Sequence, residues 1–61
     1  MKVGDLVRFK HDFQDYDPEL GVIIKVDTRP FDDEGRYFIR VNWLVDSRIR
    51  WEISTELENV A

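Results

Sequence analysis

The stretch that decides the fold is RYFIRVNWLVDSRIRWEI, residues 36–53. It contains two runs in which apolar and polar residues alternate, 39–43 and 48–53, and a short turn around residues 45–47 lies between them. A period of two is typical of β-strands that bury one face and expose the other. The pattern predicts a β-hairpin with strands at residues 36–43 and 48–53.

Three further strands are predicted outside this hairpin, at residues 6–10, 21–26 and 58–60. The segment DTRPFDDEGR (27–36) is rich in loop-forming residues, and residues 54–57 have room for only one helical turn. No helix is available to cover a flat sheet, and closure is the usual way for a few strands to hide their edges. We therefore expect one all-β domain spanning residues 1–61, a small five-stranded SH3-like barrel with one short helical turn near the C-terminus.

The predicted core consists of the apolar residues that share the inward phase of these strands. Both tryptophans, Trp43 and Trp51, fall on this phase and are expected in the core. In the strand at residues 21–26, a β-bulge would replace Ile24 by Ile23 on the buried face. The full predicted set is Val7, Phe9, Val22, Ile24, Val26, Ile39, Val41, Trp43, Ile49, Trp51, Leu57 and Val60.

Four segments together, VGDLVRF (3–9), LGVIIKV (20–26), IRVNW (39–43) and WEISTELENV (51–60), have the layout of small SH3-like barrels. The chain most resembles short proteins of unknown function that tailed phages, especially marine ones, encode. It shares a weaker resemblance, the G-x-V/I opening, with KOW-type modules. These resemblances imply an SH3-like fold and a phage origin. Peptide-binding SH3 domains are a poorer match, because A-L-Y-D-Y is absent and Trp51-Glu52 stands where they carry two tryptophans.

Composition restricts the classes of function. The net charge is −4, from nine basic and thirteen acidic residues, which disfavours nucleic-acid binding except through a local basic patch. The chain has no cysteine and one histidine, His11, so a zinc site is not expected, and no cofactor is implied. The longest apolar run is three residues, so no membrane span is expected. No signal peptide is visible, and the expected location is the cytoplasm of a host cell or a virion.

The acidic segment HDFQDYDPELG (11–21) resembles a calcium loop in its alternating acids. An EF-hand loop needs glycine at its sixth position and glutamate at its twelfth. Counted from Asp15, these positions are Leu20 and Val26. We therefore expect a solvated acidic loop at residues 12–19 rather than a metal site. Catalysis has no motif to support it, because the three glycines are dispersed and nothing places His11 beside a hydroxyl group.

The predicted partner-binding residues are aromatic loop residues and arginines, the side chains that dominate protein interfaces. They are Phe13, Tyr16, Phe31, Arg48 and Arg50. A possible anion-binding stripe is Arg40, Arg48 and Arg50, on the assumption that all three occupy the outward phase of the hairpin. The alternative is that these arginines form exposed salt bridges that contribute little stability.

The sequence thus favours a non-catalytic protein-interaction module, a phage-encoded accessory protein that docks on a host or phage protein. One alternative is a virion component that decorates or joins other subunits. Another is a KOW-like nucleic-acid-binding module that uses the arginine stripe. The thin core of a 61-residue domain leaves monomer and homo-oligomer equally open, with association by edge pairing of strands.

Overall fold

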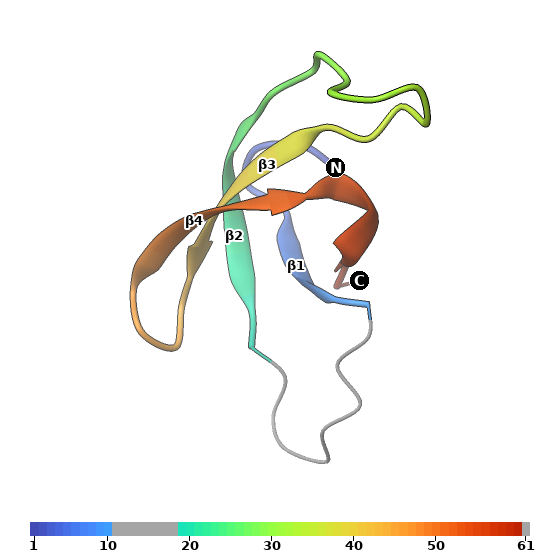
Figure 1. The fold of residues 1–61 in the computed structure, drawn as a ribbon. Helices are drawn as coiled ribbons and strands as arrows, with labels where there is room; N and C mark the ends of the chain where they lie inside the picture. The colour runs from blue at the N-terminus through green and yellow to red at the C-terminus, as the bar shows by residue number, and fades with distance from the viewer. Residues whose placement is uncertain (11–18, 61) are drawn as a thin grey trace.

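The computed structural model describes residues 1–10 and 19–60, which form five β-strands and one short helical turn (Figure 1). Each strand coincides with an apolar or alternating segment of the sequence. The elements in chain order are β1 (Leu6–Phe9), β2 (Gly21–Val26), β3 (Phe38–Trp43), β4 (Arg48–Ile53), the 3-10 helix η1 (Ser54–Glu56) and β5 (Leu57–Asn59).

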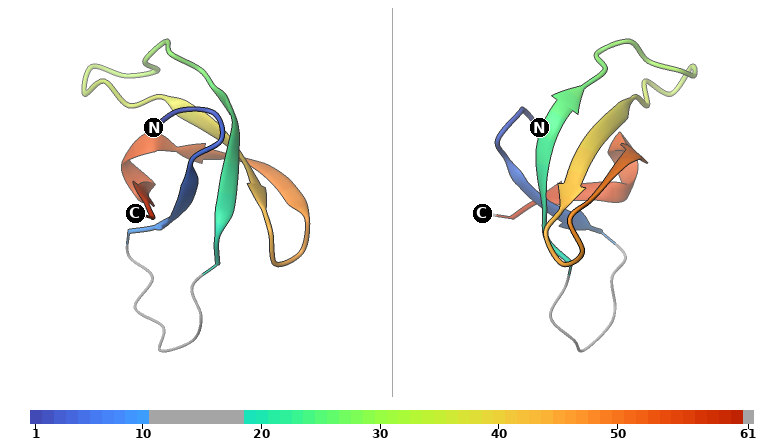
Figure 2. Two further views of the ribbon diagram at one scale, coloured as in Figure 1. Left: turned by 180° about the vertical axis from the view of Figure 1, so that it is seen from behind. Right: turned by 90° about the vertical axis from the view of Figure 1, so that its left-hand side faces the viewer.

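All strand pairs are antiparallel and belong to one sheet with the order β4-β3-β2-β1-β5. The sheet is strongly curved, so that it bends around its own inner face (Figure 2). η1 connects β4 to β5, the strands at the two ends of the sheet order. The predicted fold class is confirmed: the described residues form a small all-β fold of five strands in one curved sheet, with one helical turn near the C-terminus. β4 and β5 do not pair with each other, so the hydrogen-bonded sheet of the described strands is not closed. No helix among the described residues is long and apolar enough to cross a membrane.

The core lies on the inner face of the sheet and contains six buried apolar side chains. β3 contributes three of them, and the ring of Phe9 stacks on the ring of Trp43 with centroids 4.8 Å apart. Phe9, Val26 and Tyr37 pack against this cluster from its margin. The six buried side chains are Val7, Ile23, Ile39, Val41, Trp43 and Leu57.

β2 contains a bulge, and this bulge corrects one core prediction. Ile23 pairs with Val41 but Lys25 pairs with Arg40, so Ile24 has no opposite residue in β3. One extra residue shifts the phase of the strand. Ile23 is therefore buried and Ile24 is 39% exposed, as the bulge alternative expected.

β4 corrects two further core predictions, Ile49 and Trp51, which are 52% and 45% exposed. Directly opposite residues of an antiparallel pair point to the same face of the sheet. In the observed register, the buried Val41 lies opposite Arg50, and Trp51 lies opposite Arg40. The apolar residues of β4 do share one face, as the alternation predicted, but that face is the outer one. Val22 and Val60, also predicted as core, are only partly buried.

Gly21 provides the space that the core needs where β2 meets β3. A Cβ atom at this position would overlap Val41 Cγ1 and would lie 2.9 Å from Trp43 Cε3. We expect Gly21→Ala to destabilise the protein by about 1–3 kcal/mol, the usual cost of overpacking a core, measured by urea denaturation.

Val41→Ala removes the methyl group that the new Cβ would overlap. If the overlap causes the loss, the double variant Gly21→Ala/Val41→Ala loses less stability than the sum of the two single changes. Strictly additive losses would contradict this explanation.

Candidate functional site

The outer face of the β3–β4 hairpin carries the largest exposed apolar side chains of the described sheet. Phe38 is 39% exposed, and it lies on the same face as Ile49 and Trp51 because Phe38 pairs with Ile53 and Arg40 with Trp51. Single exposed apolar residues are ordinary, but a contiguous group is a feature of interaction sites.

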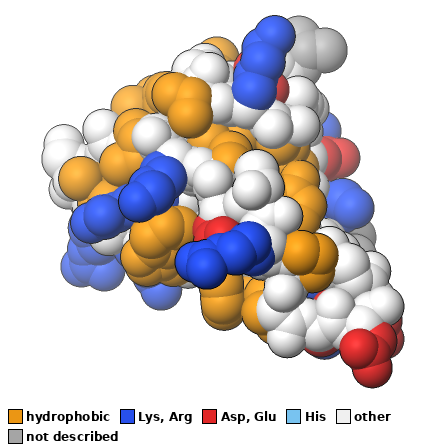
Figure 3. Space-filling view, turned by 90° about the horizontal axis from the view of Figure 1, so that it is seen from above, with side chains coloured by type: hydrophobic (Ala, Val, Ile, Leu, Met, Phe, Trp, Pro, Cys, Tyr) orange, Lys and Arg blue, Asp and Glu red, His pale blue; other side chains and the backbone are white. Residues whose placement is uncertain are grey.

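The loop between β2 and β3 adds a third aromatic ring to this face. The ring of Phe31 stacks on Phe38, with centroids 4.6 Å apart and an angle of 23° between the planes. We call Phe31, Phe38 and Trp51 the aromatic face. The molecule seen from above presents hydrophobic side chains with Lys and Arg side chains lying across and between them (Figure 3).

Two arginines lie over rings of the aromatic face. The guanidinium carbon of Arg36 is 5.4 Å from the centroid of Phe31, and that of Arg40 is 5.5 Å from the ring of Trp51. Both distances are within the range of cation–π attraction. Stacking and cation–π contacts restrict the rings, so that less conformational entropy remains to be lost when another molecule binds.

A hollow of about 260 Å³ opens on this face, lined by Asp27, Phe38 and Trp51. Two of the three lining residues are aromatic, and the third is Asp27. Asp27 accepts a hydrogen bond from the Arg29 backbone N–H at 3.1 Å, and the Arg29 side chain lies 3.6 Å from the same carboxylate. The hollow is suited to an apolar side chain with a neighbouring N–H donor.

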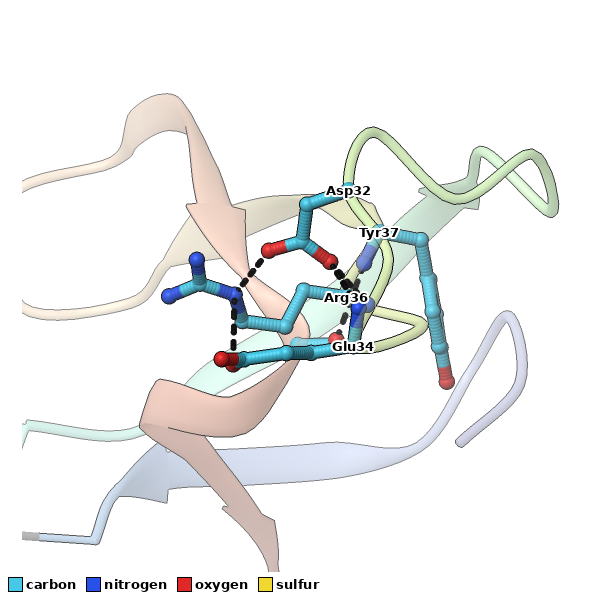
Figure 4. Close-up of polar contacts among 5 residues, drawn as sticks. Asp32, Glu34, Arg36 and Tyr37 are labelled. Atoms are coloured by element: carbon cyan, nitrogen blue, oxygen red, sulfur yellow. Dashed lines mark hydrogen bonds and ion pairs between the residues drawn. The ribbon is translucent and has the colours of Figure 1, made fainter.

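Asp32 organises the loop that holds Phe31 and Arg36 (Figure 4). Its carboxylate accepts hydrogen bonds from the backbone N–H groups of Glu34 at 3.0 Å and Arg36 at 3.1 Å, and from Arg36 Nε. The Phe31 N–H donates to the Arg36 carbonyl at 2.8 Å. Gly35 has a φ of +80°, a conformation that glycine adopts without steric cost, and this allows the tight turn.

The far end of this loop is attached to η1. The Tyr37 N–H donates to Ser54 Oγ at 3.2 Å, and the Ser54 N–H donates to the Tyr37 carbonyl at 2.8 Å. The loop is therefore held at its tip by Asp32 and at its end by Ser54. These bonds place Phe31 against the sheet.

The Asp32–Arg36 pair is electrostatically favourable. Partial desolvation acts to raise the pKa of Asp32, but the hydrogen bonds from the Arg36 side chain and from two backbone N–H groups outweigh it, and the pKa lies below its ordinary value of 3.8. The hydrogen bond to Asp32 raises the pKa of Arg36 in turn.

The residues predicted to bind a partner are placed differently by the structure. Phe31 lies on the aromatic face, whereas Phe13 and Tyr16 lie outside the described residues. That segment follows the end of β1 and precedes the start of β2, and this start is the opposite end of β2 from the 27–37 loop (Figure 1). A shared surface of all three aromatic residues therefore stays a prediction.

The predicted arginine stripe is wrong as a geometric arrangement. Arg40 is on the outer face with Trp51, whereas Arg48 and Arg50 lie opposite Trp43 and Val41 and share the other face. Arg48 also forms an exposed ion pair with Asp46 at 3.1 Å, as the salt-bridge alternative expected. Contact of Arg48 or Arg50 with a partner stays a prediction.

The acidic segment at residues 12–19 falls almost entirely outside the described residues, which include only Glu19. Within residues 1–10 and 19–60, no three His, Cys, Asp or Glu side chains are grouped in a way that could hold a metal ion.

Sequence reasoning missed Phe38, Trp51 and Asp27 as site residues. For Trp51, the missing information was the length of the turn between β3 and β4. Trp43 pairs with Arg48, so the turn has four residues, 44–47, and even positions of one strand oppose odd positions of the other. Ile39, Val41 and Trp43 then cannot share a face with Ile49, Trp51 and Ile53. A turn of three residues would have placed both sets together.

The chain matches no protein-family model, no curated protein and no solved structure. The geometry of the described residues therefore carries the functional argument.

Because the pKa of Asp32 is lowered in the fold, its ionised form contributes stability above about pH 3.8, and this contribution is lost as the pH falls through the lowered value. We expect Asp32→Asn to lower the melting temperature most at neutral pH and least in acid. Thermal melts of both proteins across this pH range provide the measurement.

Asp33→Asn is the matched control, because Asp33 is exposed and its side chain makes no hydrogen bond to any described residue. A difference between wild type and Asp32→Asn that does not change with pH would contradict the assigned role of Asp32.

Proposed function

We propose that this protein is a non-catalytic protein-interaction module that binds its partner through the aromatic face. The observation that carries the proposal is the group of exposed rings held in place by stacking and by two arginines, around a hollow with one acceptor. Aromatic residues and arginine are the side chains that contribute most to protein interfaces.

The chemistry of this face indicates what the partner supplies. The hollow between Phe38 and Trp51 takes an apolar side chain, and Asp27 accepts a hydrogen bond from a neighbouring N–H group. Arg36 and Arg40 lie at the margin, where carboxylates of the partner can pair with them. A buried apolar anchor surrounded by polar contacts is the usual organisation of an interface.

The resemblance to small phage proteins supports an accessory role, in which the module docks on a host or phage protein. The alternative, a virion component, also needs an exposed surface that binds another protein. Mass spectrometry of purified particles separates the two, because a virion component is present in stoichiometric amounts and an accessory protein is not.

Single-stranded nucleic acid is the second candidate ligand, and the same face supplies the observation that favours it. Bases stack on aromatic side chains beside basic groups in such sites, and Lys25 lies opposite Arg40 on the outer face. The carboxylates of this region, on Asp27 and on the loop that contains Asp32, would repel a phosphate backbone. This reading predicts binding that weakens steeply with salt.

An affinity pull-down from the native cell identifies the partner, and variants of the aromatic face then test the site. We expect Trp51→Ala to leave the fold largely intact, because Trp51 is 45% exposed. The affinity should fall by about 2 kcal/mol or more, the scale of an interface anchor, as measured by calorimetry.

Val45→Ala is the control, since Val45 is 68% exposed in the hairpin turn and should leave the affinity unchanged. Tyr16→Ala tests separately the segment that includes Phe13.

Unchanged affinity in both Trp51→Ala and Phe38→Ala would exclude the aromatic face as the binding site. A ligand released by moderate salt and identified as RNA or DNA would replace the protein proposal.

A further inference from the structure

β4 has one edge that pairs with β3 and one edge that pairs with no described strand. Hydrogen-bonded and non-hydrogen-bonded pairs alternate along an antiparallel ladder. The Ser54 N–H donates to the Tyr37 carbonyl, and the register continues from there, so Arg48, Arg50 and Glu52 direct their backbone groups toward β3.

It follows that Ile49 and Trp51 direct both their N–H and their C=O groups toward the open edge, and that Ile53 directs its N–H there. The carbonyl of Ile53, the N-cap of η1, accepts the first hydrogen bond of that turn instead. No backbone hydrogen bond from the outward-directed groups to another described residue is found on that side. Such a row of unpaired groups is a template for a further strand. Ile49 and Trp51 are also half exposed, so a strand on this edge would extend the apolar outer face.

We propose that a second copy of this chain pairs with this edge, β4 antiparallel to β4, with Trp51 opposite Trp51. The charges of RIRWEI select this register among the symmetric ones. With Arg50 at the centre, two arginines oppose each other, and with Glu52 at the centre, two glutamates do. With Trp51 at the centre, Arg50 of each copy opposes Glu52 of the other.

The backbone supports the same choice. Two strands exchange hydrogen bonds only when outward-directed residues oppose one another. The Trp51-centred register pairs Trp51 with Trp51 and Ile49 with Ile53. The N–H groups of all three residues and the carbonyls of Ile49 and Trp51 then face the second copy. In a register whose two-fold axis lies between two residues, each residue with outward-directed backbone groups is opposite one whose groups are directed toward β3. Such a register loses the hydrogen bonds between the two copies.

The side chains of both faces suit this pairing. Arg50 forms no ion pair within the described residues, whereas Glu52 uses Oε2 to accept a hydrogen bond from Trp43 Nε1 at 3.2 Å and keeps Oε1 for a second donor. On the outer face, two copies of Trp51 meet, and aromatic cross-strand pairs are favourable.

The pairing uses the backbone edge and the charges of β4, so it does not rest on the proposed function of the aromatic face. A six-residue strand presents an edge of roughly 20 Å. An interface of this length is in the small, weak class. The dimer is therefore concentration-dependent.

Sedimentation equilibrium of the whole chain up to millimolar concentration tests the proposal. We expect a monomer–dimer equilibrium in wild type, and a dissociation constant raised about tenfold or more in Arg50→Glu, because both attractive pairs become repulsive. Glu52→Arg should have the same effect through opposed arginines.

An equimolar mixture of Arg50→Glu and Glu52→Arg should dimerise again, since every opposed pair in the mixed dimer joins a glutamate to an arginine. Arg48→Glu is the matched control. It makes the same change of net charge, but residue 48 opposes Ser54 in this register and should affect dimerisation much less.

Ile49→Pro gives a readout that does not depend on Glu52. It removes an outward N–H group without removing a bond to β3, and proline is tolerated on edge strands. We expect a folded monomer, with unchanged circular dichroism. A strict monomer in wild type would overturn the proposal, as would a dimer that Arg50→Glu leaves intact or that the mixture of folded variants fails to restore.

Discussion

Val41 and Trp43 pack against the bare backbone of Gly21, and this contact sets the position of β2 on β3. It commits one face of β3 to the interior, where Ile39, Val41 and Trp43 are almost completely buried. Phe9 then stacks on Trp43 and brings β1 to the same interior. Six buried side chains are a small core, and no described part of the chain supplies another.

The strand segments and the helical turn could be predicted because alternation and turn residues report local structure directly. Most of the core followed from the same pattern, from Val7 in β1 to Leu57 in β5. The relation between neighbouring strands could not be predicted in this way. The bulge at Ile24 and the four-residue turn after Trp43 decide which alternate residues of β2 and β4 face the core. Neither has a distinctive amino-acid composition, yet each moves apolar residues from one face of the sheet to the other.

The candidate site suffered from the same ambiguity. Trp51 was expected inside and lies outside, and Arg40 was expected beside Arg48 and Arg50 but lies on the opposite face. Phe31 was expected at the surface of a loop, and it does lie there. Its contact with Phe38 depends on the hydrogen bonds that Asp32 accepts from the same loop. A single sequence does not show such side-chain bonds. Asp32, Asp33 and Glu34 are three consecutive acidic residues, and nothing in their order shows that Asp32 is the one that accepts hydrogen bonds from the Glu34 and Arg36 backbone N–H groups.

The two tryptophans occupy opposite environments only a few residues apart. Trp43 is 2% exposed and shielded from water, whereas Trp51 is 45% exposed. An indole in a dry interior emits at shorter wavelength than one in contact with water, and a dissolved quencher reaches only the second. The protein therefore contains two intrinsic optical probes, one that reports loss of the core and one that reports coverage of the surface. Unfolding and association can be followed separately in an unlabelled sample.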